Sequence, residues 1–320
     1  MASKEIEMYG GKPVLEAINS KELVEAVEAF KSEYPDIPLE APYVVRVKRK
    51  SVAKKAFSDD KTIGVAILHD NVEVIGECAF WECQNLTSIV MPDSLKEIGK
   101  SAFDYCGLTS VVIPASVTKI RYGTFSACHS LTSVEIPTSL TEIGERAFSG
   151  CSTLPSIVIP DSVTKIGKQA FWVCKNLTSI VIPDSVTEIA AYGFNESGLV
   201  GIEIGKSFTE ISSGLFERCA NLTNIVIPDT VTEIGSMAFQ WCRGLTSVKI
   251  GKSVTKIGGY AFSGCKNLTS IVIPDSVTEI ENRAFEGCTG LKEISVKSRE
   301  ILEKNASIIE ELGIVVVERG

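Results

Sequence analysis

The sequence predicts an α/β solenoid, a right-handed coil of about eleven repeats of 22–23 residues with a cap at each end. Three observations carry this prediction. A phenylalanine recurs every 22 or 23 residues, a leucine follows it at a nearly constant distance, and the stretch Lys175–Ile189 is identical to Lys266–Ile280. Each repeat should place a parallel strand on the concave face and short helices or turns on the other side.

The phenylalanine and leucine series define the length of the repeat. The spacing between successive phenylalanines shortens to 22 residues twice. Both times the missing residue lies between the position usually held by cysteine and the leucine, as a comparison of residues 106–108 with residues 83–86 shows. A deletion confined to one place marks a loop that tolerates changes in length. The phenylalanines are Phe57, Phe80, Phe103, Phe125, Phe148, Phe171, Phe194, Phe216, Phe239, Phe262 and Phe285; the leucines are Leu86, Leu108, Leu131, Leu154, Leu177, Leu199, Leu222, Leu245, Leu268 and Leu291.

One repeat, residues 86–106, shows the expected elements. The spacing Leu-x-x-Ile-x-Met from Leu86 predicts a short strand that Pro92 ends, because proline cannot donate to a strand ladder. Residues 95–98 fit either a second short strand or a 3₁₀ turn. Residues 102–106 fit one or two turns of helix with one face inward. Stacking of the coils is expected to close the core, since one coil cannot bury so many apolar groups alone.

A glycine follows the isoleucine of the second segment in most repeats. Other repeats place Arg121, Ala190, Ser212 or Glu281 there, and a position that requires positive φ would rarely accept all four. The glycine is therefore expected to serve close packing. These glycines are Gly76, Gly99, Gly144, Gly167, Gly235 and Gly258.

The repeat unit Leu-x-x-Ile-x-Ile-Pro-x-Ser-Val-x-x-Ile-Gly-x-x-Ala-Phe-x-x-Cys resembles the BspA-type leucine-rich repeat, also called the Treponema pallidum type. Residues 157–174 match it almost letter for letter, and the resemblance covers about residues 45–297. It implies a leucine-rich-repeat solenoid. It also implies a surface or secreted protein of bacteria or protists, in several cases an adhesin for host proteins.

The repeat is absent from both ends of the chain. The sequence therefore predicts three domains: an N-terminal helical cap or small module at 1–42, the solenoid at 43–297, and a C-terminal helix–strand cap at 298–320. A helix should run from Ser20 to about Tyr34 and stop before Pro35. A second helix should span about residues 300–312, with Gly313 at its stop and a last strand at residues 314–317.

Nine of the ten cysteines occupy one coil position, and Ser197 fills the missing rung. Side chains in register run parallel, so neighbouring Cβ atoms should stay near 5 Å, beyond the roughly 3.8 Å that disulfides prefer. We expect buried, reduced thiols that act as small apolar residues. The nine are Cys83, Cys106, Cys128, Cys151, Cys174, Cys219, Cys242, Cys265 and Cys288.

Nothing in the sequence points to an enzyme. His69 and His129 are the only histidines, and neither has a nucleophile at a recognisable catalytic spacing. No C-x-x-C pair or glycine-rich phosphate loop occurs, so no metal, cofactor or catalytic residue is predicted. The net charge of −8 argues against a nucleic-acid partner, and no apolar run approaches the roughly 20 residues of a membrane span.

The concave strand face is the predicted binding surface for a protein or peptide. Its central position forms an apolar stripe broken by charges, although exposed valines also suit strands in general. Serines flank the stripe in most repeats. The stripe is Val90, Val112, Glu135, Val158, Val181, Glu203, Val226, Lys249 and Val272.

Three other surface features have simpler interpretations. A column of glutamates and lysines from Glu97 to Glu279 reads as a solvated face with weak ion pairs. Trp81, Trp172 and Trp241 lie on the far side of the coils and are too scattered for one patch. A basic run reads as a solvated cap edge, or alternatively as a site for an anionic surface. It comprises Arg46, Lys48, Arg49, Lys50, Lys54 and Lys55.

Three functions follow: a non-enzymatic protein-interaction solenoid, a surface adhesin, or a passive or engineered repeat scaffold. The first is preferred, with a monomer expected. The polar, acidic start at residues 1–7 lacks the pattern of a secretory signal, and a ladder of free thiols suits a reducing compartment, so a cytoplasmic location is expected. The family resemblance implies the cell surface instead.

Overall fold

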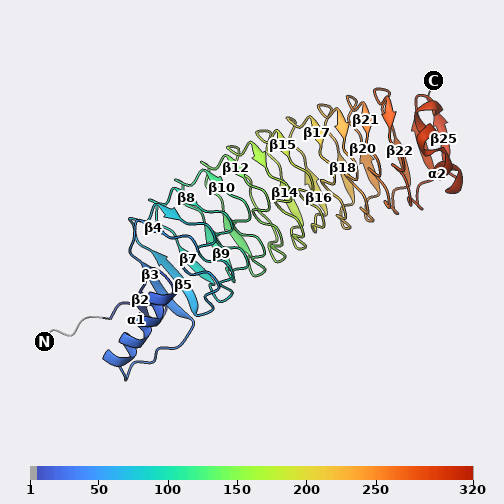
Figure 1. Cartoon of the computed structure of the whole chain (residues 1–320). Helices are drawn as coiled ribbons and strands as arrows, with labels where there is room; N and C mark the ends of the chain where they lie inside the picture. Colours follow the sequence, from blue (N-terminus) through green and yellow to red (C-terminus); the bar gives the residue numbers. More distant parts are fainter. Residues whose placement is uncertain (1–5, 320) are drawn as a thin grey trace. The chain divides into compact units, whose positions relative to one another are not determined.

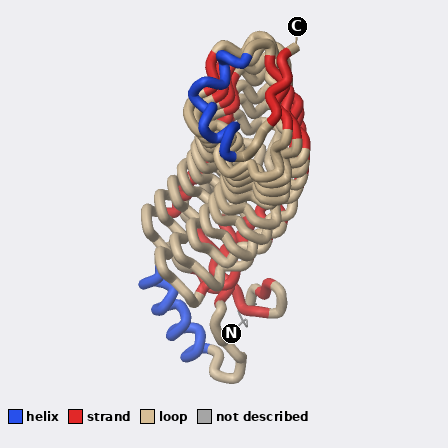
Figure 2. Tube along the Cα trace, turned by 90° about the vertical axis from the view of Figure 1, so that its right-hand side faces the viewer, coloured by secondary structure: helices blue, strands red, loops and turns tan. Residues whose placement is uncertain are grey.

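The computed structural model describes residues 6–319. It forms two compact units, the first ending at Leu140 and the second beginning at Thr141. Figure 1 shows the strands of each unit as successive rungs, and Figure 2 shows that loops and turns make up most of each coil. The predicted solenoid of parallel strands is confirmed in both units.

The first unit begins with β1 (Met8–Tyr9), β2 (Lys12–Glu16) and α1 (Ser20–Glu33). The predicted helix is confirmed, but Asn19 caps it: the side chain of Asn19 accepts a hydrogen bond from the Glu22 amide at 2.9 Å. Leu23 and Phe30 are its buried residues. The strand β2 pairs in parallel with β3 (Tyr43–Val47), so the N-terminal segment contributes strands as well as the expected helix.

The coils of the first unit carry two ladders of strands. Pairing is parallel and in register, as between Val111 of one coil and Val134 of the next. The longer strands after β3 are β5 (Ile63–Leu68), β7 (Ser88–Val90), β9 (Ser110–Val112) and β11 (Ser133–Glu135). The shorter strands are β4 (Ser51–Val52), β6 (Val74–Ile75), β8 (Glu97–Ile98) and β10 (Lys119–Ile120). Residues 97–98 thus form a second strand rather than a 3₁₀ turn.

The second unit repeats this arrangement. Its longer strands are β14 (Ser179–Val181), β16 (Gly201–Glu203), β18 (Asn224–Val226), β20 (Ser247–Lys249), β22 (Ser270–Val272), β24 (Glu293–Val296) and β25 (Val315–Glu318). Its shorter strands are β12 (Glu142–Ile143), β13 (Lys165–Ile166), β15 (Glu188–Ile189), β17 (Glu210–Ile211), β19 (Glu233–Ile234), β21 (Lys256–Ile257) and β23 (Glu279–Ile280). The coil of Val158 is an exception: Pro155 has no N–H to donate, and only an isolated bridge joins Ser156 to Ser179.

The side opposite the longer strands consists of turns. The helical turns expected at residues 102–106 do not form, because alternate amides bond between coils: Phe80 N–H donates to Ala102 O at 2.8 Å and Glu82 N–H to Asp104 O at 2.8 Å. An α-helix would use these amides within its own chain. Each coil instead places two residues at positive φ, for example Ser101 at 50° and Tyr105 at 59°.

Stacked phenylalanines form the core, as the period predicts. The rings of Phe57, Phe80, Phe103 and Phe125 in the first unit stack with centroids 5.3–5.5 Å apart. In the second unit the rings from Phe148 to Phe285 stack at 5.3–6.0 Å. Every one of these side chains is fully buried, so each coil closes the core of the next.

The glycines after the second strand confirm the packing explanation. A Cβ at Gly99 would lie 2.5 Å from the backbone of Gly76 and Glu77, and one at Gly167 would lie 2.4 Å from Glu145 N. Neither glycine has a positive φ. The backbones of adjacent coils therefore approach too closely here for most side chains to be free of strain.

The secondary structure of the C-terminal segment differs from the prediction in one respect. A 3₁₀ helix, η1 (Arg299–Asn305), precedes α2 (Ala306–Glu311), where a single helix was expected. The two helices meet at Asn305, which is completely buried. Its side chain accepts from Ala284 N at 2.9 Å and donates to Glu281 O at 2.9 Å, so it satisfies the backbone of the last coil. Gly313 has φ 61° at the predicted stop, and β25 is the predicted last strand.

Candidate interaction surface

In each unit, the outward-facing last residues of the three-residue strands, together with Val158, belong to what we call the valine stripe. Its members in the first unit are Val90, Val112 and Glu135; those in the second are Val158, Val181, Glu203, Val226, Lys249 and Val272. All nine side chains are exposed, as strand alternation predicts, whereas their neighbours Val111, Ile180 and Ile225 are buried.

The second unit carries the longer part of this stripe. Val158 is 81% exposed, and Val181, Val226 and Val272 are each more than half exposed. Parallel register sets Glu203 beside Val181 and Lys249 beside Val226. From Val181 onward, apolar and charged side chains therefore alternate along this face.

Polar rows border the stripe. The flanking serines predicted from sequence lie on the same face and are mostly exposed. A threonine row that the sequence reasoning missed runs beside them: Thr132 donates both its N–H, at 2.8 Å, and its hydroxyl, at 3.0 Å, to Thr109 O. Thr246 does the same to Thr223 O. The recurring Leu-Thr-Ser sequence was the available signal, and these bonds hold neighbouring strands in register.

The cysteine ladder lies inside the coils and is not part of the surface. All ten cysteines are free, and the nine of the ladder are buried, as predicted. Each thiol for which a bond is described reaches the carbonyl of a phenylalanine one coil earlier: Cys106 Sγ lies 2.8 Å from Phe80 O, and Cys288 Sγ 3.0 Å from Phe262 O. Burial raises the pKa of Cys174 and Cys219 to about 12, so these thiols stay protonated at neutral pH.

The basic run near residue 50 is largely paired. Lys50 lies 3.2 Å from Glu73 and Lys54 lies 2.9 Å from Glu77, while Arg46 and Lys48 pair with Glu7 and Glu16. The lysine partners hold the pKa of Glu73 and Glu77 below the usual range. These contacts support the interpretation as a solvated cap edge.

The shorter strands carry the predicted column of glutamates and lysines. Lys165 lies 3.8 Å from Glu188, and Lys256 lies 3.8 Å from Glu233 and 2.8 Å from Glu281. The side chains remain partly exposed, so solvent screening leaves each pair with little effect on stability. The column therefore marks a solvated face.

Among residues 6–319, no group of three or more His, Cys, Asp or Glu side chains is arranged to hold a metal ion. His69 bonds to Asn71 at 3.1 Å, and His129 contacts the ring of Tyr105. Within the same residues, no helix combines the length and apolar character of a membrane span.

Comparisons with known proteins agree with this architecture. The family model described as "BspA type Leucine rich repeat region (6 copies)" matches residues 50–176, 97–223, 141–267 and 209–308. No curated protein matches significantly. A leucine-rich repeat protein from Bacteroides ovatus is 30% identical over 79% of this chain and 76% of its own, with a TM-score of 0.61.

Two further solved structures share the fold. A leucine-rich repeat protein from Eubacterium ventriosum is 24% identical, covers 76% of this chain and 82% of its own, and has a TM-score of 0.52. The pneumococcal vaccine antigen PcpA is 18% identical over 86% of this chain and 85% of its own, with a TM-score of 0.59. At these identities the likeness concerns the fold alone.

Proposed function

The chain belongs to the BspA-type leucine-rich repeat family, and on that premise we propose that it is a non-enzymatic interaction solenoid whose valine stripe binds a protein or peptide. Solenoids present many positions of successive repeats to one partner. The observation that carries the proposal is the row of valines more than half exposed on the second unit. Exposed apolar side chains gathered on one face and bordered by polar residues favour an interaction surface.

The charged members of the stripe would determine the orientation in which a partner binds. Glu203 and Lys249 have opposite charge and stand two rungs apart on β16 and β20, with Val226 between them. A partner with the complementary order of charges gains attraction at both positions, and one with the reverse order is repelled. The alternative, that the valines are only good strand formers, predicts no such dependence.

The test is binding after charge reversal. A displayed peptide library is selected on the protein, and affinities of the selected peptides are measured for the double variant Glu203→Lys, Lys249→Glu. We expect these peptides to bind at least tenfold more weakly, with an unchanged melting temperature because both side chains are exposed.

The matched control reverses an exposed pair on the shorter strands, Lys165→Glu with Glu188→Lys. Peptides that bind the valine stripe should bind this control with wild-type affinity. Equal affinity for the wild type and both variants would contradict the proposal.

A surface adhesin is the second candidate, and the family membership is what favours it. Antibody labelling of intact cells distinguishes it from an interaction protein inside the cell. A passive scaffold is the third, and the near-identical coils favour it. Selection that yields no peptide sensitive to Glu203 and Lys249 would support the scaffold.

The ends are proposed as caps of a monomeric solenoid, with boundaries at 1–42, 43–297 and 298–320. The contact of α1 with β2 and the Asn305 bonds to the last coil support this role. No cofactor forms part of the proposal.

A further inference from the structure

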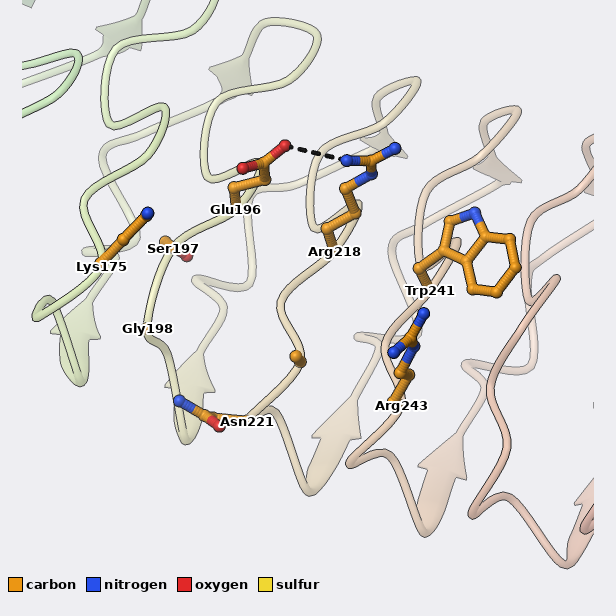
Figure 3. A pocket seen from close by; sticks show the side chains of 9 residues that line it. Lys175, Glu196, Ser197, Gly198, Arg218, Asn221, Trp241 and Arg243 are labelled. Carbon is orange, nitrogen blue, oxygen red and sulfur yellow. Dashed lines mark hydrogen bonds and ion pairs between the residues drawn. The ribbon is translucent and has the colours of Figure 1, made fainter.

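The loop edge of the second unit contains a cationic hollow, which we define by Lys175, Glu196, Arg218, Trp241 and Arg243. Ser197, Gly198, Ala220 and Asn221 complete its lining, and its volume is about 620 Å³. Figure 3 shows the labelled side chains around the open space. None of these residues belongs to the valine stripe.

The hollow coincides with a shortened coil. Gly198 follows Ser197 directly and precedes Leu199, so this coil lacks the extra loop residue that its neighbours have at Asn176 and Asn221. A Cβ at Gly198 would lie 2.0 Å from Lys175 O, which shows how far the shortened loop is drawn back against the preceding coil. The missing residue therefore leaves space between the flanking loops.

Two guanidinium groups at the hollow are held in place. Arg218 Nη1 lies 3.2 Å from Glu196 Oε1, and Arg218 Nε lies 3.5 Å from Glu217. Arg243 lies over the ring of Trp241, 5.3 Å from its centroid. A Cβ at Gly264 would lie 2.6 Å from that indole ring, so the ring packs directly on the backbone of the next coil. Holding both groups beforehand lowers the entropy that a ligand must remove.

The charge of the hollow opposes that of the whole chain. Three cations and one carboxylate give the lining a net charge of +2, whereas the chain carries −8. Among residues 6–319, no acidic side chain forms an ion pair with Lys175 or Arg243. A negatively charged ligand is therefore the complementary occupant.

The dimensions favour an extended chain over a small ion. The lining residues come from four consecutive coils, and three steps of about 4.8 Å span about 14 Å. An extended peptide rises about 3.3 Å per residue, so about four residues cover this distance. Carboxylates also match the fork of the arginine side chain.

We propose that the cationic hollow binds a short acidic peptide segment, with its carboxylates on Lys175, Arg218 and Arg243. This site is separate from the valine stripe and does not depend on the proposed function. The ligand carboxylate competes with Glu196 for Arg218. The source of the carboxylate is an acidic side chain or the end of a chain, and the test separates these two.

The experiment measures fluorescence polarisation of a labelled, amidated pentapeptide that carries two acidic residues, at low salt. The first control is the same amidated peptide with side-chain amides in place of the two acidic side chains. The second control has these side-chain amides but a free C-terminal carboxylate, so its binding would identify recognition of a chain end. We expect the acidic peptide to bind and the amide version to fail. Lys175→Gln and Arg243→Gln should each weaken binding about tenfold, as expected for loss of a charged hydrogen bond. Glu196→Gln should strengthen it severalfold.

The chain supplies a matched control for Lys175. Lys266 occupies the same place in the identical segment Lys266–Ile280, but the coil after it keeps its full length and Lys266 does not line the hollow. Lys266→Gln should bind like the wild type. Inserting one asparagine between Gly198 and Leu199 should fill the hollow and abolish binding, with the fold checked by circular dichroism.

Several results would overturn the proposal. These are equal binding by Lys175→Gln and Lys266→Gln, equal binding of the acidic and amide peptides, or binding of inorganic phosphate or a uronate oligosaccharide by a protein to which the acidic peptide fails to bind. The variant Glu203→Lys, Lys249→Glu should retain the hollow's affinity within twofold. Failure of the valine stripe as a binding surface therefore leaves this test unaffected.

Discussion

The two shortened coils, one in each unit, have the same backbone deletion but different side chains around it. Gly107 and Gly198 occupy the same position, and a Cβ at either would lie 2.0 Å from a carbonyl oxygen of the preceding coil, Gln84 O or Lys175 O. Their backbones are thus drawn back to the same degree. Their surroundings differ, because Tyr105 meets His129 edge-on at 6.2 Å beside Gly107.

The coil of Gly198 places a carboxylate where the other places an aromatic ring, and cations lie around it. Glu196 occupies the position of Tyr105, and Arg218 and Lys175 lie nearby around an open hollow. The repeat register therefore fixes the backbone at both sites, while the side chains of neighbouring coils give the two sites different chemistry.

The largest expected effect concerns what the two coils share. Phe103→Ala and Phe194→Ala each remove a fully buried ring from the stack. Each should lower the free energy of unfolding by about 3–5 kcal/mol, because the cavity adds to the lost burial. Urea denaturation followed by circular dichroism measures both.

Similar losses would show that the shortened coils have equivalent cores. Val158→Ala, at an 81% exposed position, is the control and should change stability by less than about 0.5 kcal/mol. A loss below about 1 kcal/mol for either phenylalanine would contradict the continuous stacking within its unit.

The next effect tests the shared backbone. Gly107→Ala and Gly198→Ala each place a methyl group against a carbonyl oxygen that cannot move without shifting a coil. We expect a destabilisation of about 1–3 kcal/mol for each, measured by thermal and urea unfolding.

Gly201→Ala is the matched control, since no atom lies within 4 Å of its Cβ position and its φ is not positive. This substitution should leave stability unchanged or raise it by up to about 1 kcal/mol, because alanine restricts the unfolded chain. If Gly198→Ala behaved like Gly201→Ala, the close approach at the hollow would be wrong.

The smallest effect concerns the buried thiols. Cys106 occupies the ladder in one shortened coil, and Ser197 replaces it in the other. Burial raises the pKa of Cys106 in the folded chain, above about 8.5 for an unfolded thiol. The contribution of this thiol to the free energy of unfolding is fully present below about pH 8.5. It falls as the pH rises towards the pKa of the folded chain, because over that range only the unfolded chain releases the proton.

Cys106→Ser should therefore flatten the decline of stability between pH 9 and 10.5 by about 1.4 kcal/mol per pH unit. Ser197→Cys should steepen it by a similar amount. Urea unfolding in reducing buffer at several pH values measures both slopes, and parallel curves for the two variants and the wild type would count against burial as the cause.

Much of the fold was predictable because the pattern is repeated many times. The phenylalanine period predicted the stack of buried rings, and strand alternation predicted that Val181 is exposed and Ile180 buried. The different residue types that follow Ile120 and Ile189 correctly indicated that the glycines at this repeat position serve close packing. The prediction of helical turns was wrong, because residue spacing within one coil does not show that the amides of Phe80 and Glu82 donate hydrogen bonds to the next coil.

The surfaces were predictable to different degrees. The valine stripe follows from alternation alone, so its positions could be named from sequence, and its binding role stays a prediction. The cationic hollow could not be named in the same way, since its cations Lys175, Arg218 and Arg243 lie in three different coils, and Arg218 lies at a different repeat position from the other two. Only the shortened loop at Gly198 signalled that this edge was unusual.

The sequence by itself determined the period, the inward and outward sides of each strand, and the positions of the deletions, because these depend on residue order within one coil. The tertiary structure decided which side chains of different coils meet, such as Asn305 with the last coil and Arg218 with Glu196. Those meetings depend on the closeness of neighbouring backbones and on side-chain rotamers, which residue order within one repeat does not specify.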